Sequence, residues 1–545
     1  MNLLECDVLV VGGGAAGSRA AYEAKRIHPH LNVILAVAGG FGSSGSTNLI
    51  ASESLGINAP YDLMKNGDSP DVFYRDILET GAGLSDPLLA RLLADEACAR
   101  IDELMALGLR FDQADDGILQ RKLSGCTKAR SLTCSGSTGR EILRVLKGEI
   151  QKQNTAVLEN TRVIDLIQND HGGVCGALAL VGRDSVFIGA GAVVLANGGA
   201  GRIFLHNVNP PSIEGDGWSM AYRVGARFVN MEFFQVGPAL FNSPLKFIIH
   251  SHMWRLRPRL TNALGEEFLP RYCPSGVDPA EVLDLKAMSY PFSVRTDAKY
   301  LDIAIFKEVM AGRGTPAGGV WFDVTHVDRD TLMARAPITY ETFRRAGIDL
   351  ARERIEVGLV VQNFNGGILI DGDGFTGVAG LYAAGEATGG VHGADRPGGN
   401  NLIDTQVFGY RAGRAAADCA AGTGKKSVHT GFPEDVAPTA AYPSPEEKDL
   451  LQESSDLYYA NLTIVRTKKG IQEVLDFNER HRRNAGKMVS NRLTVGSLLG
   501  TAALVRQESR GTHYREDFPQ RDPAWDKRIT LSRARGEAPK VEFLA

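Results

Sequence analysis

Short apolar runs that end on glycines recur through the first two hundred residues and predict buried strands. Periodic apolar positions between them predict helices over 88–107 and 137–151, and the second of these opens with Ser137, Thr138 and Gly139, which favour a helix N-terminus. Strands that alternate with helices indicate an α/β fold. The predicted strands cover residues 8–11, 32–37, 156–167, 173–181 and 186–201.

The first of these strands turns into a helix through Gly12, Gly14 and Gly17, which have the spacing G-x-G-x-x-G. Gly12 permits a tight turn, Gly14 lets the backbone approach a pyrophosphate, and Gly17 lets the helix and strand pack closely. The helix N-terminus then faces the phosphates. The motif indicates a dinucleotide site, although a purely structural turn would have the same glycines.

The pattern of glycine-ended strands stops near residue 238 and returns near residue 366, which indicates a domain split by an insertion. In between, charge and proline content rise. A proline-rich linker at 432–445 leads to a helical region at 446–510. We therefore predict a Rossmann-like dinucleotide-binding domain in two parts, an inserted α+β cap domain between them, and a linker followed by a helical C-terminal domain and tail. These segments are residues 1–237, 238–351, 352–424 and 425–545, in which the first and third form the split domain.

Composition narrows the possible partners. A length of 545 residues with ordinary apolar and charged fractions is typical of two to four domains, and the net charge of -4 argues against a nucleic-acid surface. No apolar run approaches the length that spans a bilayer, and residues 1–6 have neither a basic nor an apolar signal region. We expect a cytoplasmic protein that is not integral to a membrane.

The seven cysteines are scattered and odd in number, and none forms a C-x-x-C pair. We therefore expect neither a disulfide framework nor an iron–sulfur cluster on this chain, and we assign no metal ligands.

Seven long strings together resemble one family of flavoproteins. In order they are GGGAAG from Gly12, SGSTNLIA from Ser44, STGREIL from Ser137, LANGGAG from Leu195, EGDGWSMAYRVGARFVNMEFFQ from Glu214, LYAAGEATGGVHGADRPGGNNLIDTQVFG from Leu381 and ESRGTHYREDFP from Glu508. The series is similar to the flavoprotein subunits of succinate dehydrogenase and fumarate reductase, to L-aspartate oxidase, and to the flavin subunit of adenylylsulfate reductase. It covers nearly the whole chain and implies an FAD-binding domain.

The resemblance also implies where FAD would bind. The pyrophosphate would lie on the glycine turn, the loop 43–47 would run beside the flavin, and Asp216 and Glu386 would hold polar parts of the cofactor. Glu386 follows a strand and a glycine, where a carboxylate can accept hydrogen bonds from sugar hydroxyls. Asn401 opens a helix whose positive end can stabilise the reduced flavin. The implied set is Gly12, Gly14, Ala15, Ala16, Gly17, Ala38, Ser43, Ser44, Gly45, Ser46, Thr47, Val163, Asn197, Gly198, Asp216, Glu386, Asn401 and Leu402.

Two of these assignments have a structural alternative, since Asp216 and Asn401 could cap the helices that they open, and capping is compatible with cofactor contact. Two departures from the family concern the cofactor itself. Val37 stands where an acidic residue usually binds the ribose. Ser46 stands where the respiratory enzymes have the histidine that attaches the flavin covalently, so we predict non-covalent FAD.

The substrate residues of the family are largely replaced. Gly237 and Ala239 stand where a histidine and a threonine grip dicarboxylates, and Gln362 stands where another substrate histidine is usual. Only Arg396 survives from the substrate set. A pocket for a four-carbon dianion needs several cationic or strong donor groups, so plain fumarate or succinate is a disfavoured substrate.

The cap supplies candidate proton carriers. By spacing from Gly237, His250 takes the place of a family glutamate that relays protons. The segment 295–304 lacks the family's proton-transferring arginine and leaves Lys299 as its nearest cation, which could equally be a surface residue. His392, near Arg396, is either a structural donor or a catalytic group.

The same cap segment also carries Arg255, Arg257 and Arg259, which would point one way on an extended strand and could meet an anion. A solvated surface edge is the alternative.

We therefore expect an FAD-dependent oxidoreductase that transfers a hydride between flavin and a small anionic organic substrate. Arg396 would clamp the anion, Gln362 would orient it, and His250 or Lys299 would relay protons. An adenylylsulfate-reductase-like flavin subunit with a ferredoxin-like partner is one alternative, and a non-catalytic electron-transfer subunit is another. Without a cysteine cluster, the flavin would need oxygen, a quinone, a soluble carrier or an electron-transfer subunit to exchange electrons.

Overall fold

In a computed structural model of the protein, the largest sheet is built around the first strand. The structure describes residues 2–49, 55–115, 117–182, 184–242, 245–423, 443–534 and 538–544. Strand β1 (Asn2–Val11) lies between β2 (Val33–Ala36) and β11 (Asp184–Leu195) and runs parallel to both. Val8, Leu9 and Val10 are fully buried, which explains the continuous apolar run. The remaining strands are β8 (Ala156–Leu158), β19 (Leu381–Ala383), β10 (Val174–Val181) and β9 (Thr161–Gln168).

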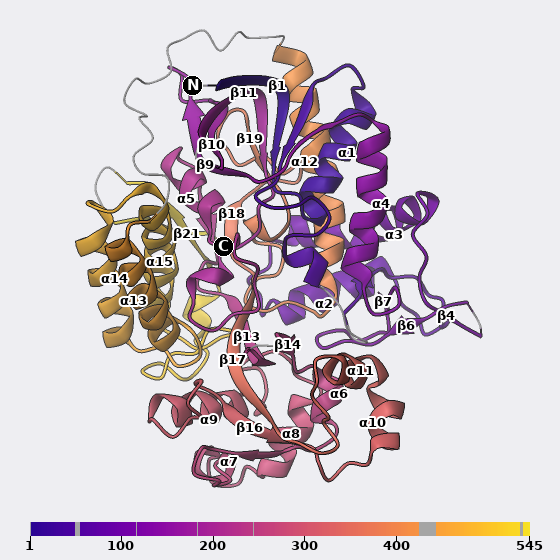
Figure 1. Cartoon of the computed structure of the whole chain (residues 1–545), viewed down its shortest axis with the longest axis vertical. Coiled ribbons are helices and arrows are strands. Elements are labelled where there is room, and N and C mark those ends of the chain that lie inside the picture. The colour runs from indigo at the N-terminus through magenta and orange to yellow at the C-terminus, as the bar shows by residue number, and fades with distance from the viewer. Residues whose placement is uncertain are drawn as a thin grey trace.

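Helices gather on one side of this sheet (Figure 1), and two of them touch through glycines. A β-carbon on Gly409 would lie 2.7 Å from the carbonyl oxygen of Ala16, and one on Gly413 would lie 2.4 Å from that of Ala20. The helix that carries Asn401 is therefore fixed directly against the helix that follows the glycine turn. The helices of this side are α1 (Ala15–Ile27), α2 (Pro70–Thr80), α3 (Pro87–Ala106), α4 (Thr138–Lys152) and α12 (Asn400–Thr423).

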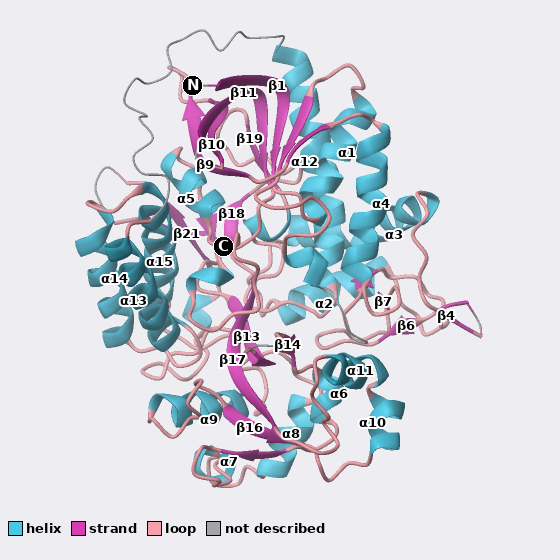
Figure 2. Ribbon diagram, viewed as in Figure 1, coloured by secondary structure: helices cyan, strands magenta, loops and turns pink. Residues whose placement is uncertain are grey.

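Two long antiparallel strands, β13 (Phe234–Leu240) and β17 (Ile355–Phe364), lead from this domain into the inserted segment (Figure 2). They continue into an antiparallel sheet in the order β14-β13-β17-β16-β15. The further strands are β14 (Phe247–Ile248), β15 (Arg259–Thr261) and β16 (Val320–Asp323). The helices of the insertion are α6 (Ser251–Trp254), α7 (Leu269–Tyr272), α8 (Pro279–Lys286), α9 (Lys299–Met310), α10 (Arg329–Arg335) and α11 (Pro337–Arg345).

The C-terminal region forms three packed helices and then returns to the nucleotide-binding domain. The helices are α13 (Pro445–Leu462), α14 (Lys468–Arg482) and α15 (Lys487–Val505). A smaller sheet in the order β20-β18-β12-β21-β22 joins the two regions. The strands of this sheet are β12 (Phe228–Val229), β18 (Gly367–Leu369), β20 (Thr388–Gly389), β21 (Arg528–Ser532) and β22 (Lys540–Leu544). Residues 432–442 of the predicted linker lie outside the described part of the chain.

Short elements complete the description. Helix α5 (Asp216–Arg223) packs beside β9, and a small sheet and a hairpin flank α2 and α3. These strands are β3 (Ile57–Asn58), β4 (Gln113–Ala114), β5 (Gly117–Ile118), β6 (Gln120–Arg121) and β7 (Ser131–Leu132). Within the described ranges, no helix is both long enough and apolar enough to cross a bilayer.

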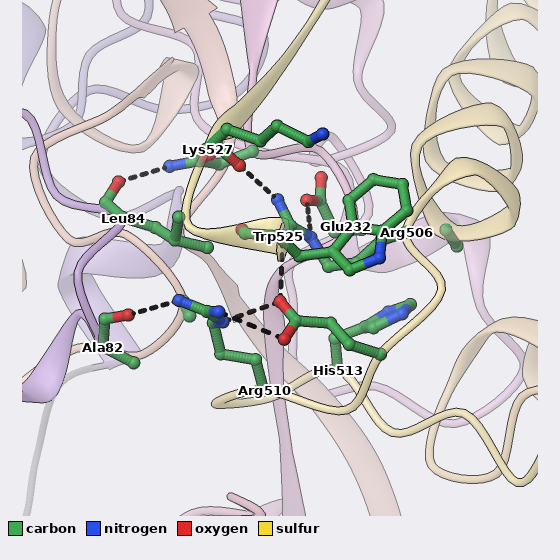
Figure 3. Close-up of polar contacts among 12 residues, drawn as sticks. Ala82, Leu84, Glu232, Arg506, Arg510, His513, Trp525 and Lys527 are labelled. Atoms are coloured by element: carbon green, nitrogen blue, oxygen red, sulfur yellow. Dashed lines mark hydrogen bonds and ion pairs between the residues drawn. The ribbon is translucent and has the colours of Figure 1, made fainter. Parts of the chain in front are cut away.

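A fully buried network of charges holds the C-terminal string to the rest of the molecule (Figure 3). Arg506 donates to Glu232 at 2.6 Å and to Glu508 at 2.9 Å. Arg510 donates to Glu508 at 2.6 Å and to the carbonyl oxygen of Ala82 at 2.8 Å. Because buried ions are stable only when paired, this network fixes the string across the nucleotide-binding domain.

Candidate active site

A cavity of about 770 Å³ runs from the glycine turn between β1 and α1 to the strands that enter the cap. Gly12, Gly13 and Gly14 line one end. At the other end the lining includes His250, Tyr290, Gln362 and Arg396. A cleft of this size between two domains is typical of a site for a cofactor and a small substrate.

The glycine turn has the geometry that the spacing predicts. Gly12 adopts a φ of +110°, and a β-carbon there would lie 2.4 Å from the carbonyl oxygen of Ala196. A β-carbon on Gly17 would lie 1.8 Å from the carbonyl oxygen of Gly12, so Gly17 serves helix–strand packing and does not line the cavity. Gly14 precedes α1 without a side-chain cap, and this helix start faces the cavity with Ala15 and Ala16. Such an end binds anions such as a pyrophosphate.

The loop after β2 forms the next part of the wall, where Ala38, Ser44, Gly45, Ser46 and Thr47 line the cavity. The backbone N–H of Ala15 donates to the Thr47 hydroxyl at 3.1 Å, which ties the loop to the helix start. The Ser46 hydroxyl is buried and has no hydrogen-bond partner within the described residues. It is therefore available to a ligand.

Polar side chains around the middle of the cavity are incompletely paired. Glu386 accepts a hydrogen bond from the backbone N–H of Phe364 at 3.1 Å, and burial raises its pKa to about 7. Asn401 donates to the Asn363 side chain at 2.7 Å. The Asn197 side-chain oxygen is buried and has no partner among the described residues. Gly198 and Leu402 line the same region, so this wall offers both polar groups and apolar surface to a ligand.

Several residues of the implied cofactor set do not line the cavity. Asp216 receives hydrogen bonds from Arg162 at 2.8 Å and from Asn491 at 3.0 Å, and its N-terminal place on α5 is not a side-chain cap. Val163 is buried within β9 opposite Ala179. The Ser43 hydroxyl donates back to Gly40. The cavity lining therefore does not support cofactor contacts by Asp216, Val163 or Ser43, because each of these side chains packs against or bonds to other parts of the chain.

Val37 follows β2 directly and lines the cavity. An apolar side chain therefore stands at the strand end where an acidic residue commonly binds the ribose.

A tyrosine that the sequence did not indicate fills the place of the expected histidine. A β-carbon on Gly237 would lie 2.7 Å from the Gln362 side-chain nitrogen and 2.9 Å from the Tyr290 hydroxyl. Gln362 donates to that hydroxyl at 2.5 Å, and Tyr290 donates to the carbonyl oxygen of Pro238 at 3.4 Å. Ala239 packs away from this point against Phe241 and Val360. A tyrosine–glutamine pair therefore lies beside Gly237, where the resemblance implies the histidine of the family.

Arg396 is anchored at the substrate end by neutral groups. Its guanidinium donates to the side-chain oxygen of Gln235 at 2.8 and 3.2 Å and to the carbonyl oxygen of Pro397 at 2.9 Å. The side-chain nitrogen of Gln235 in turn donates to the Asp395 carboxylate at 3.0 Å. Burial lowers the pKa of Arg396 to about 10, so it remains charged at neutral pH. A cation fixed by neutral partners is well placed to bind an anion.

Two histidines line the cavity near this arginine. His250 lies between β14 and α6 with its ring centroid 5.7 Å from that of Tyr290, and burial lowers its pKa to about 3, so it is neutral at pH 7. His392 lies 3.2 Å from a carboxylate oxygen of Asp404, and its other ring nitrogen is buried without a partner within the described residues. Burial also lowers the pKa of His392.

The remaining candidate cations do not line the cavity. Lys299 begins α9 with its ammonium 3.7 Å from the Asp297 carboxylate, so its assignment as a proton relay is not supported. Arg255, Arg257 and Arg259 are exposed, and they do not form an extended row that points one way, because Arg255 directly follows α6 and Arg257 has a φ of +50°. Arg257 pairs instead with Asp284 at 2.7 Å.

Comparison with known proteins assigns the family. The chain matches the FAD binding domain family over residues 7–402 and the fumarate reductase flavoprotein C-terminal family over residues 485–544. It belongs to the fumarate reductase flavoprotein family. This flavoprotein binds FAD and is an FAD-dependent oxidoreductase. The unpaired Ser46 and Asn197 oxygens and the open glycine turn fit such a cofactor.

Similarity to individual members of the family extends over the whole chain. The flavoprotein is 33% identical to a subunit of the fumarate reductase (CoM/CoB) of Methanothermobacter marburgensis, with 98% of each chain covered. It is 32% identical to the L-aspartate oxidase of Caulobacter vibrioides, again with 98% of each covered. The solved structure of Mycobacterium smegmatis Sdh1 in complex with UQ1 matches with a TM-score of 0.82 and 30% identity, covering 100% of this chain and 95% of that one.

The resemblance to adenylylsulfate reductase is one of fold alone. The enzyme of Archaeoglobus fulgidus matches with a TM-score of 0.71 but only 17% identity. The alternative of an adenylylsulfate-reductase-like flavoprotein is therefore not favoured.

Proposed function

We propose that this flavoprotein exchanges a hydride with an anionic organic substrate other than plain fumarate or succinate. The observation that carries the proposal is the replacement of the expected histidine side chain by Tyr290 and Gln362 above Gly237, while Arg396 is kept. The chemistry that FAD supplies when bound is two-electron exchange with a substrate carbon. Every other task falls to side chains of the chain itself.

Arg396 would bind a carboxylate of the substrate through charge-assisted hydrogen bonds. Its orientation is set by Gln235, which accepts from two guanidinium nitrogens at once. The Tyr290 hydroxyl and the Gln362 amide would orient a second polar group of the substrate. Both groups are neutral, and the tyrosine ring is bulkier than an imidazole, which favours a substrate shape different from that of a four-carbon diacid.

His250 is the residue that we propose as proton carrier. Its imidazole lines the cavity and lies beside the ring of Tyr290. Burial keeps it neutral at pH 7, so it would accept a proton when a bound anionic substrate stabilises the imidazolium. Lys299 is a weaker candidate because an aspartate holds it outside the lining. His392 is paired with Asp404 and would position the turn that carries Arg396.

We also propose that FAD is held without a covalent bond, because Ser46 occupies the position of the flavin-linking histidine. Acid or heat denaturation should then release the yellow cofactor into the supernatant. Flavin that stays with the precipitated protein would contradict this.

Stopped-flow absorbance of the bound flavin tests the function. We expect at least one anionic organic acid to bleach the oxidised flavin, or an unsaturated acid to reoxidise the reduced flavin, at a rate that Arg396→Ala abolishes. A lack of change with every acid, with FAD bound, would favour the second candidate, an electron-transfer subunit without its own substrate. The replaced family residues favour that candidate, and the retained Arg396 argues against it. We propose an electron-transfer subunit or another soluble carrier as the redox partner, because the scattered cysteines provide no cluster on this chain.

A further inference from the structure

Two cations line the cavity in addition to Arg396. Arg202 lies in a short turn of 3-10 helix at Gly201–Ile203, directly after the glycine-rich string that follows β11. Lys246 lies just before β14 on the cap side. The two come from segments that are separated by one helix and two strands in the sequence, and the fold brings both to one cavity.

Among the described residues, neither cation has an acidic partner. The Arg202 side chain makes no hydrogen bond or ion pair within the described part of the chain. Lys246 donates only to the backbone carbonyl of Asn207 at 3.2 Å, and burial together with the charge of Arg202 lowers its pKa. The acidic residues of the described lining, Glu386 and Asp404, are engaged elsewhere, with the N–H of Phe364 and with His392. Arg202 is half-buried and Lys246 is exposed, so an anion between the two would relieve the repulsion of these like charges.

The cofactor phosphates do not account for this pair. The phosphate end of the cavity is the glycine turn at the start of α1, which offers backbone N–H groups. Lys246 belongs instead to the hairpin in which β14 pairs with β13, through Leu240 opposite Phe247. Figure 1 places β14 beside the cap and well away from the β1–α1 turn.

We propose that Arg202 and Lys246 form a second anion subsite, which binds the distal charged group of an elongated organic dianion. This inference rests on the proposed function, since Arg396 would hold the other carboxylate. We take the bridging dianion to be longer than succinate, because the pair and Arg396 are separate parts of the lining of a cavity of about 770 Å³.

Equilibrium titration of the FAD-loaded protein, followed by flavin absorbance and by calorimetry, tests the subsite. The probes are succinate, adipate and suberate, with butyrate, hexanoate and octanoate as singly charged controls of matched length, and inorganic sulfate. We expect the longer diacids to bind more tightly than the monoacids of the same length. The double variant R202Q/K246Q should lose that advantage, by about tenfold or more in Kd, and should lose sulfate binding, while Arg396→Gln weakens both acid series.

Because the Arg202 side chain has no partner within the described residues and Lys246 has only a carbonyl, the double variant should fold and keep its FAD content. Arg255→Gln, which removes an exposed cap arginine outside the cavity, is the matched control and should behave like the wild type. Equal loss for diacids and monoacids, unchanged diacid and sulfate binding, or a loss of FAD affinity in the double variant would each overturn the subsite. Sulfate binding through the pair without tighter binding of any diacid would uphold an anion site and refute its role in binding an elongated dianion. Diacid binding that the double variant keeps, or a lack of binding by every probe, would refute the subsite. The stopped-flow assay of the bound flavin decides the proposed function separately.

Discussion

The Tyr290 hydroxyl lies in the space that a side chain on Gly237 would need, because a β-carbon there would lie 2.9 Å from it. The two residues therefore have to be considered together. A histidine at position 237 would therefore require the Tyr290 and Gln362 side chains to shift.

Gly237→Ala should destabilise the protein by about 1 kcal/mol, because the added methyl group would push apart the ends of the Gln362 and Tyr290 side chains and disturb their hydrogen bond. Urea unfolding followed by circular dichroism measures this difference. Gly148→Ala is the matched control, since a β-carbon on this helical glycine meets nothing within 4 Å, and it should be neutral or stabilising. Equal effects of the two substitutions would show that the Gly237 site is not tightly packed.

Arg396→Lys should lower kcat/KM for the substrate by about 10- to 100-fold. The lysine keeps the charge but loses the fork that donates to Gln235 and orients the cation, and charge-assisted hydrogen bonds contribute about 1.5–3 kcal/mol. Steady-state kinetics and flavin content are the measurements, and FAD should stay bound. Kinetics unchanged from the wild type would remove Arg396 from the substrate site.

His250→Asn should reduce kcat by about 10²-fold or more, as is typical for loss of a general acid or base. The matched comparison is Lys299→Gln, which should leave kcat unchanged because Asp297 holds this lysine outside the cavity lining. A profile of kcat against pH separates a proton carrier from a packing role, since only the former should change the pH dependence. A large effect of Lys299→Gln, with little effect of His250→Asn, would reverse the assignment.

FAD should bind more tightly as the pH rises from 6 to 8. Burial raises the pKa of Glu386 to about 7 in the protein without ligand, so the carboxyl group loses its proton over this range. The ionised carboxylate is the stronger acceptor for cofactor hydroxyls. Flavin fluorescence titration gives Kd at each pH. In Glu386→Gln the dependence should flatten, and a flat profile in the wild type would show that Glu386 does not contact the cofactor.

Arg506→Met should cost about 3–5 kcal/mol of stability, because it leaves the buried carboxylates of Glu232 and Glu508 without their shared cation. Arg521→Met is the control. It removes a half-exposed partner of Asp526 and should cost at most about 1 kcal/mol. Denaturant unfolding of the two variants checks the contrast, and similar losses would mean that Arg506 is not essential to the network.

Local features of the site could be predicted from the sequence. The turn at Gly12 is formed by residues adjacent in the sequence, and it has the geometry that their spacing predicts. The replacement of the family grip was also visible, since Gly237 and Gln362 are read directly from their strings. The place of Tyr290 could not be predicted, because this residue reaches the site only through the folding of the cap. No spacing in the sequence links Tyr290 to Gly237.

Two site assignments are not supported by the cavity for the same reason. Asp216 has a place on its helix that suits either cofactor contact or capping, but Arg162 and Asn491, both distant in the sequence, occupy its carboxylate. Lys299 is the nearest cation in its segment, yet the start of α9 directs it to Asp297. Partners brought by tertiary structure decide both outcomes.

The small sheet that joins the C-terminal region to the nucleotide-binding domain has a consequence for biosynthesis. Strand β12 at Phe228–Val229 is completed by β21, which begins only at Arg528. While the ribosome makes the intervening segment, the edge of β12 has no such neighbour and is open to pairing with another chain. A nascent polypeptide stalled before Arg528 would expose that edge, so chaperone protection should matter most in this late interval of translation.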